Sequence, residues 1–274
     1  MQQKILVYVN TFDYELTQNC MNWLKTALIF SVIASVTAGC DEKEDDKNNH
    51  PQTHDIVIKF QPQFNGQDVT DWENSSISDA YGRAVDIQTF KYYLSDIRLV
   101  AGTETRSVLE ADLIDHRSDP LTGTFDFYSE AEIVAGNYEA LVINLGLTDD
   151  LNAIDPATYP SSSPLSAVHG MYWDWATKYI FTKTEGRIDS DGDGTPDQSW
   201  FIHSGMNELL KKDIEIMRSF NVPEQDTLTV LVNLNAFFIQ NNDTSDLVLN
   251  GQSHTTDNME LATDFTNRIA DAFE

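Results

Sequence analysis

The sequence predicts an all-β protein, an antiparallel β-sandwich or barrel-like domain with one C-terminal amphipathic helix. Segments rich in β-branched and aromatic residues recur along the chain, and no long helical pattern separates them. Apolar residues recur at helical spacing only near the C-terminus. Because 41% of the 274 residues are hydrophobic, the chain can build a sizeable core. We therefore expect a single β domain over residues 55–274.

Four segments of this domain are predicted to form strands. The first, residues 55–60, alternates apolar and polar residues and precedes the turn signal Asn65-Gly66. The others are rich in β-branched, leucine and aromatic residues and comprise residues 85–100, which are expected to supply one or two strands, 138–147 and 226–238.

The last segment of the chain is predicted to be a helix. Asp257 and Glu260 have the spacing of a capping box, in which Asp257 is the cap. The apolar residues that follow at helical spacing are Ala262, Phe265, Ile269 and Phe273. We expect this amphipathic helix to close the domain.

The formal net charge of −27 excludes one class of partner. So acidic a chain repels the phosphates of nucleic acids, and nucleic-acid binding is therefore not expected. The same charge favours cations and basic proteins as partners over anionic lipid surfaces.

Residues 21–39 have the pattern of a lipoprotein signal peptide. A lysine precedes the apolar run of residues 27–36, and small residues stand directly before Cys40, the expected lipidation site. The run is too short for a transmembrane helix, and an uncleaved anchor or an ordinary secretory signal is the alternative. Residues 1–20 carry acidic residues where a signal peptide has positive charge. Met21 is therefore the expected start, and residues 1–20 are a misassigned upstream extension.

The segment after the lipidation site, residues 40–54, is polar and charged, which predicts an acidic, solvated tether. Residues 43–46 resemble the acidic export signal of Bacteroidetes surface lipoproteins, and a plain spacer is the alternative. We expect an outer-membrane lipoprotein that faces the periplasm or the cell surface. It would touch the membrane only through its lipid anchor.

The two cysteines leave the expected mature domain without a thiol, because Cys20 precedes Met21 and Cys40 carries the lipid. The domain then has no disulfide, no thiolate ligand and no cysteine nucleophile. A bound metal must be held by histidine, methionine, carboxylate or carbonyl groups.

Residues 189–197 form the sharpest local motif, a loop in which oxygen-bearing side chains recur at every second position. Ca²⁺ takes about six to eight oxygen ligands, and this spacing supplies several from one loop. The candidate calcium ligands are Asp189, Asp191, Asp193, Thr195 and Asp197. Because Trp200 occupies the position of the bidentate glutamate of an EF-hand, the loop is not an EF-hand. We expect a structural calcium ion, and an acidic turn without an ion is the alternative.

Residues 169–181 combine a histidine and a methionine with tryptophan, tyrosine and phenylalanine side chains. On a strand, His169, Met171, Trp173 and Trp175 would share one face. Taken alone, the segment is typical of core packing, with His169 at the strand end, because methionine and aromatic rings fill cores without a metal.

The order of motifs along the domain resembles the MbnP-like family of periplasmic and surface copper-binding proteins. Residues 90–99 resemble its F-x-Y-Y-x-S-x-I-x-L strand, and residues 145–152 resemble its glycine-containing strand end. The M-x-W-x-W of residues 171–175 and the F-x-H-x-G of residues 201–205 follow in the order of the family. The chain departs from the pattern where Ala153 replaces a histidine of the proteobacterial branch.

The resemblance implies a copper site. Its candidate ligands are His203, from the F-x-H-x-G motif, and then His169, His254 and Met171. In the family a tryptophan can be oxidised to kynurenine by a di-haem cytochrome c peroxidase-like partner, which gives an aniline nitrogen near the metal. The candidates for this modification are Trp173, Trp175 and Trp200.

The leading hypothesis is a lipid-anchored, extracytoplasmic copper-binding protein that captures or handles the metal. The alternative is a calcium-stabilised cell-surface binding module for a glycan or a protein. An enzyme is not expected, because the sequence has no G-x-S-x-G or H-E-x-x-H motif and its mature domain has no cysteine.

Overall fold

The structure is a computed structural model that describes residues 52–73, 75–117, 128–174, 177–240 and 243–274. The predicted extension (1–20), signal peptide (21–39), Cys40 and all but the end of the tether (40–54) lie outside the described residues, as does Trp175. Among the described residues, no helix combines the length and the apolar character needed to cross a membrane.

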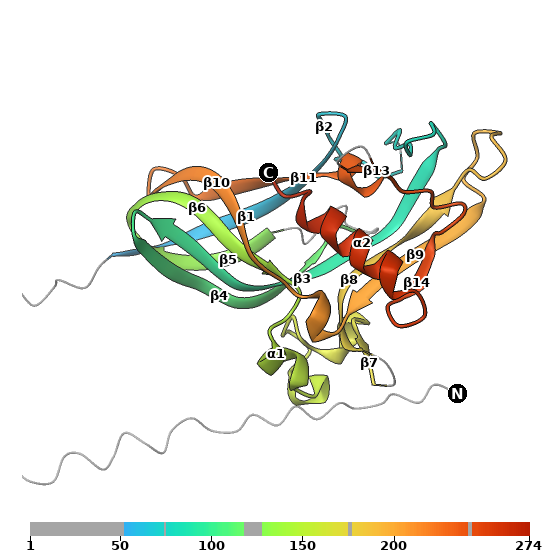
Figure 1. Cartoon of the computed structure of the whole chain (residues 1–274). Coiled ribbons are helices and arrows are strands. Elements are labelled where there is room, and N and C mark those ends of the chain that lie inside the picture. Colours follow the sequence, from blue (N-terminus) through green and yellow to red (C-terminus); the bar gives the residue numbers. More distant parts are fainter. Residues whose placement is uncertain (1–51, 74, 118–127, 175–176, 241–242) are drawn as a thin grey trace, which may run out of the picture. The chain divides into compact units, whose positions relative to one another are not determined.

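Two main β-sheets build the domain (Figure 1). The smaller sheet has the order β11 (Thr227–Asn233), β1 (Thr53–Phe64), β2 (Gln67–Asp68), and β5 (Tyr128–Val134) also pairs with β1. β1 runs parallel to β11 and antiparallel to β5. The first strand thus begins before residue 55 and extends beyond the predicted residue 60.

The larger sheet has the order β10 (Lys211–Val222), β6 (Gly136–Leu145), β3 (Val85–Ala101), β8 (Lys178–Ile188), β9 (Gln198–Gly205), β14 (Gln252–His254). β4 (Glu104–Asp115) pairs with β3, and the short β7 (Tyr172–Trp173) pairs with β8. β3 holds this sheet together, since its first half pairs with β8 and its second half pairs with both β4 and β6.

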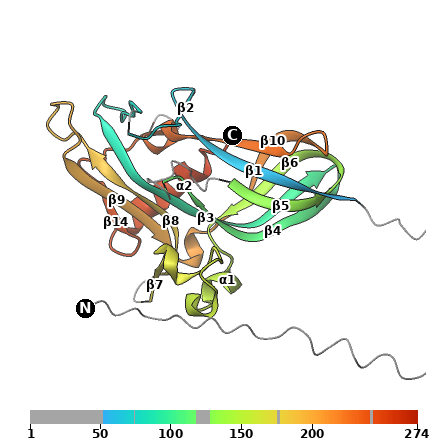
Figure 2. The same cartoon turned by 180° about the vertical axis from the view of Figure 1, so that it is seen from behind.

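The remaining elements are short apart from one helix. They are α1 (Asp149–Ala153), β12 (Ile239–Gln240), β13 (Asp243–Thr244), the C-terminal helix α2 (Met259–Ala270), and the 3₁₀ turns η1 (Pro156–Thr158), η2 (Ala167–His169), η3 (Asn207–Leu209) and η4 (Leu234–Phe237). α1 and β7 lie near each other at one end of the domain in both views (Figures 1 and 2).

The main core lies between the two sheets and α2. Alternate residues of β11 are buried, including Leu228, Val230 and Val232, as the period of a half-buried strand requires. Phe265 and Ile269 of α2 are fully buried in the same cluster. The structure confirms the all-β sandwich with its C-terminal helix, and the sheets do not close into a barrel.

The helix cap and the end of β11 also differ from the sequence prediction. The side chain of Asn258, not of Asp257, accepts the N–H of Leu261 (3.3 Å) and caps α2. The strand predicted over residues 226–238 ends at Asn233, whose side chain accepts the N–H of Asn235 (3.1 Å) and starts a 3₁₀ turn. In both places a local side-chain cap decides the boundary.

His116 is a fully buried histidine within this core. Its ring stacks on Phe90 with centroids 4.6 Å apart, and its Nε2 lies 3.0 Å from the hydroxyl oxygen of Tyr92. Burial disfavours the imidazolium and lowers the pKa of His116 to about 3.

This buried imidazole should make the free energy of unfolding depend on pH. Below a pH of about 6.5, His116 binds a proton in the unfolded chain but stays neutral in the folded chain. The free energy of unfolding therefore decreases as the pH falls from about 6.5 towards 3. At pH 4 the loss from this group is about 3 kcal/mol. Denaturant unfolding of His116→Gln should show a shallower pH dependence than the wild type. His169→Gln, at a partly exposed histidine, is the control, and equal slopes for both variants would contradict the prediction.

Candidate metal centre

His203 and His254 lie side by side on neighbouring strands of the larger sheet. β14 pairs with β9 in parallel, and the register puts His254 directly opposite His203. Their ring centroids are 5.3 Å apart, with the ring planes inclined by 65°. Two imidazoles that bind one ion through nitrogens at about 2 Å have ring centroids about 5–6 Å apart. The pair is therefore spaced as two ligands of a shared metal ion.

His203 is buried, and among the described residues only one of its ring nitrogens has a hydrogen-bond partner. Its Nε2 lies 2.8 Å from Oε1 of Glu185, which stands on β8 and also accepts the hydroxyl of Thr89 (3.0 Å). Within the described part of the chain, the buried Nδ1 of His203 has no hydrogen-bond partner. An unpartnered nitrogen in a buried ring is costly unless something binds it.

The electrostatics keep the ring of His203 neutral. Burial lowers the pKa of His203, although the carboxylate of Glu185 opposes this shift. The hydrogen bond from His203 lowers the pKa of Glu185 to about 2, and the nearby Lys183 acts in the same direction. A neutral imidazole beside an ionised carboxylate keeps a lone pair for a metal.

His254 is held by the turn that precedes α2. Oδ1 of Asp257 accepts the backbone N–H of His254 (2.6 Å), and Oδ2 lies 3.1 Å from its ring Nδ1. Burial would raise the pKa of Asp257, but these hydrogen bonds outweigh it and the pKa is lowered. Thr255, in a left-handed conformation with φ 71°, donates its hydroxyl to the carbonyl of His203 (2.9 Å). The turn thus connects the two histidines through the backbone as well.

Two aromatic rings flank the histidine pair. The ring centroid of Trp173, on β7, is 5.1 Å from His203 and 5.5 Å from His254. Phe201, two residues before His203 on β9, has its ring centroid 4.4 Å from that of His254. The site is therefore a pair of imidazoles between aromatic walls, a donor set that copper accepts in either oxidation state.

The other predicted copper and tryptophan candidates lie elsewhere. His169 is in a 3₁₀ turn, not on a strand with Trp173; its Nε2 lies 2.9 Å from the carbonyl of Ser163, and no ring contact joins it to the histidine pair within the described chain. Met171 is buried in the smaller core cluster. Trp200 is buried on the core face of β9 against Phe265, opposite the face that carries His203.

The carboxylates that support the pair carry no distinctive signal in the sequence. Glu185 appears in the sequence as one charge among many, and Asp257 was predicted to be a helix cap. Their contacts depend on which strands become neighbours, which a single sequence does not specify. The alternation in β8 does place Glu185 and Lys183 on one face, and this is the one signal that points to Glu185.

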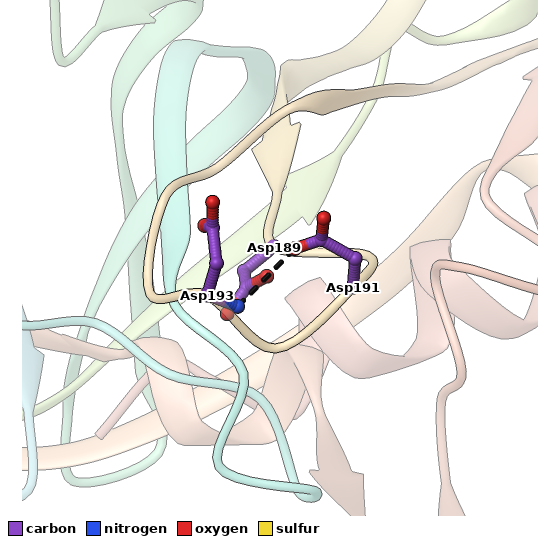
Figure 3. Close-up of side chains that lie close together, drawn as sticks. All are labelled: Asp189, Asp191 and Asp193. Atoms are coloured by element: carbon purple, nitrogen blue, oxygen red, sulfur yellow. Dashed lines mark hydrogen bonds between the residues drawn. The ribbon is translucent and has the colours of Figure 1, made fainter.

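The acidic loop joins β8 to β9 and collects three carboxylates (Figure 3). Oxygen atoms of Asp189, Asp191 and Asp193 lie within 4.8 Å of one another. The carboxylate of Asp189 is buried and accepts the N–H groups of Gly192 (2.7 Å) and Gly194 (2.9 Å). These bonds hold the loop closed around the buried carboxylate.

The other two predicted calcium ligands have different surroundings. The N–H of Thr195 donates to the carboxylate of Asp193 (2.7 Å). Asp197 accepts the N–H of Ser190 (3.0 Å), which lowers the pKa of Asp197. Asp197 therefore closes the base of the loop and is not one of the three clustered carboxylates.

Gly205, two residues after His203, allows the β7–β8 hairpin to approach β9. A Cβ atom at this position would lie 2.6 Å from Oγ1 of Thr177 and 2.7 Å from the carbonyl oxygen of Tyr179. Since Trp173 is on the same hairpin, this close approach also brings Trp173 to the histidine pair.

The substitution Gly205→Ala should therefore destabilise the domain. Relieving the clash requires backbone movement, which costs about 1–3 kcal/mol of unfolding free energy. Gly136→Ala is the matched control, because the nearest atom to a Cβ there is 3.9 Å away. Denaturant unfolding measures both variants, and equal stabilities would contradict the packing described for Gly205.

Comparisons with known proteins place the domain in a family. MbnP from Methylosinus trichosporium has a similar structure, with a TM-score of 0.50 and 14% sequence identity over 72% of this chain and 80% of that chain. At this identity the likeness concerns the fold alone. No curated protein matches the chain. The sequence model of the MbnP family matches residues 53–259, which is most of the chain, and the protein therefore belongs to the MbnP family.

Proposed function

We propose that this protein binds copper outside the cytoplasm, with His203 and His254 as ligands, and that it captures or handles the metal without catalysing a reaction on it. The observation that carries the proposal is the in-register pairing of the two histidines, with ring centroids 5.3 Å apart. The buried Nδ1 of His203, which has no hydrogen-bond partner among the described residues, supports it. Imidazole binds Cu²⁺ more strongly than it binds the neighbouring first-row divalent ions, which favours copper.

We also propose Trp173 as the tryptophan that is oxidised to kynurenine. Within the described residues, Trp173 is the tryptophan whose ring contacts both histidines, whereas Trp200 is enclosed by the core. Oxidative cleavage of the indole C2–C3 bond, with peroxide as the oxidant, would put oxygen on both carbons and give an N-formyl group. Hydrolysis of this group would release C2 as formate and leave an aniline nitrogen beside the histidine pair. A di-haem cytochrome c peroxidase-like partner would perform the oxidation.

The location of the protein forms part of the proposal. Lipidation of Cys40 and the acidic segment behind it would anchor the domain to the outer membrane, facing the periplasm or the cell surface. The metal would then be taken from, or passed to, extracytoplasmic carriers.

A structural calcium ion in the acidic loop is a second proposal. Three carboxylates within 4.8 Å of one another, on a loop closed by backbone N–H donors, favour a bound cation because like charges this close repel each other.

The calcium-stabilised glycan- or protein-binding module remains the alternative for the whole protein. The aromatic rings of Trp173 and Phe201 count against it, because they pack on histidines and do not form an exposed row.

Copper binding should depend on the paired histidines and not on the others. His203→Ala and His254→Ala should each weaken Cu(I) binding beyond the about 10–100-fold typical of supporting residues, because each removes a ligand. The measurement is competition with a chromophoric chelator, on protein without a histidine tag. His169→Ala is the control, and a loss of copper in this variant with retention in His203→Ala would refute the assignment.

Oxidation of Trp173 is tested by peptide mass spectrometry of protein purified from its native host. Because Trp173 and Trp175 share one tryptic peptide, fragment-ion spectra must locate the change, and a mass gain on Trp173 itself is expected. Unmodified Trp173 together with a modified Trp200 peptide would show that the oxidised residue lies elsewhere.

Calcium should raise the thermal stability of the domain through the acidic loop. An ion that binds only the folded state stabilises it, and each kcal/mol raises the melting temperature of a domain this size by about 2–4 °C. The increase should disappear in Asp189→Asn, which weakens the cluster, and should persist in Glu139→Gln, an exposed control on β6. If millimolar calcium leaves the melting temperature of the wild-type protein unchanged, the loop does not bind a structural calcium ion.

A further inference from the structure

Within the part of the chain that the structure describes, each histidine of the candidate metal centre has one ring nitrogen beside a carboxylate and one without such a contact. In His203 the nitrogen beside the carboxylate is Nε2, and in His254 it is Nδ1. The nitrogens that do not contact these carboxylates are therefore Nδ1 in His203 and Nε2 in His254.

We propose that Glu185 and Asp257 are positioning residues that fix these tautomers, so that the metal is bound by Nδ1 of His203 and Nε2 of His254. This inference rests on the proposed copper function for its ligand, but the tautomers themselves are a property of the metal-free protein. An ionised carboxylate has no proton to donate, so the ring nitrogen that it contacts carries the N–H. The opposite nitrogen then holds the lone pair that a metal needs.

The contact to Glu185 is the better held of the two. Its carboxylate is fixed by the hydroxyl of Thr89 (3.0 Å) and lies 3.6 Å from Nζ of Lys183. The side chains of His203 and Glu185 are 4% and 33% exposed, so water competes little for the bond. Because Nε2 is occupied, the only nitrogen left for a metal is the buried Nδ1, the atom that has no hydrogen-bond partner in the described residues.

Asp257 holds His254 from the turn before α2. It accepts both the backbone N–H and the ring Nδ1 of His254, which fixes the ring relative to its own backbone. The side chains of His254 and Asp257 are 40% and 55% exposed, so this contact is more hydrated. We expect Asp257 to contribute less to metal affinity than Glu185.

The tautomers are tested first, on the metal-free wild-type protein. Long-range ¹H–¹⁵N correlation spectra at mildly alkaline pH report which ring nitrogen carries the proton. The inference predicts Nε2–H for His203 and mainly Nδ1–H for His254. In Glu185→Ala the preference of His203 should be lost, a change that a merely structural role of Glu185 would not cause. A proton on Nδ1 of His203 in the wild type would overturn the inference.

Copper affinity is tested next, with Cu(I) and a competing chelator. Glu185→Gln should weaken binding by about 10–100-fold, the usual effect of removing a residue that orients a ligand, and Asp257→Asn should weaken it less. Glu215→Gln, which makes the same change of charge at an exposed position on β10, should bind like the wild type. Affinities of Glu185→Gln and Glu215→Gln that cannot be distinguished would overturn the positioning role.

The two proposals fail in different ways. A wild-type protein that shows the expected tautomers but takes up no copper would refute the copper function and leave the carboxylate–histidine assignment standing. A protein that binds copper through the two histidines but has the opposite tautomers would refute the positioning role of Glu185 and Asp257. The copper function would then stand.

Discussion

The parallel pairing of β14 with β9 is the contact on which the candidate site depends. β14 is only three residues long, and a shift of one residue would turn His254 to the opposite face of the sheet. The register is held at both ends: Phe201 donates its N–H to the carbonyl of Gly251 (2.8 Å), and the hydroxyl of Thr255 bonds to the carbonyl of His203 (2.9 Å). A Cβ atom at Gly251 would lie 2.1 Å from the carbonyl oxygen of Leu247, so glycine is required where the chain enters this pairing.

The two histidines differ in their burial and in the carboxylates that support them. His203 is enclosed, neutral and supported by an ionised Glu185, whereas His254 is partly exposed and supported by Asp257 at the surface. An arriving cation would meet His254 first and the buried Nδ1 of His203 behind it. The negative carboxylates that hold both rings, in a chain with a net charge of −27, favour a cation at this place over an anion.

Sequence patterns predicted the long elements because these carry their own periodicity. β3 and α2 were recognised from residues 85–100 and from the helical spacing of Phe265 and Ile269. The site was predicted only in part, since His203 and His254 come from distant segments whose register no local pattern specifies. Alternation along β9 could have separated Trp200 from His203, because residues three apart on a strand face opposite sides. The role of Asp257 was not predictable, as the neighbouring Asn258 took the helix cap in its place.

A crystal structure of the copper-loaded protein, with anomalous scattering recorded at the copper edge, would test directly whether His203 and His254 share a metal ion. We expect one strong anomalous peak between His203 and His254, about 2 Å from Nδ1 of the first and Nε2 of the second, with the ring derived from Trp173 beside it. A peak at His169 or in the acidic loop, with none between the paired histidines, would contradict it.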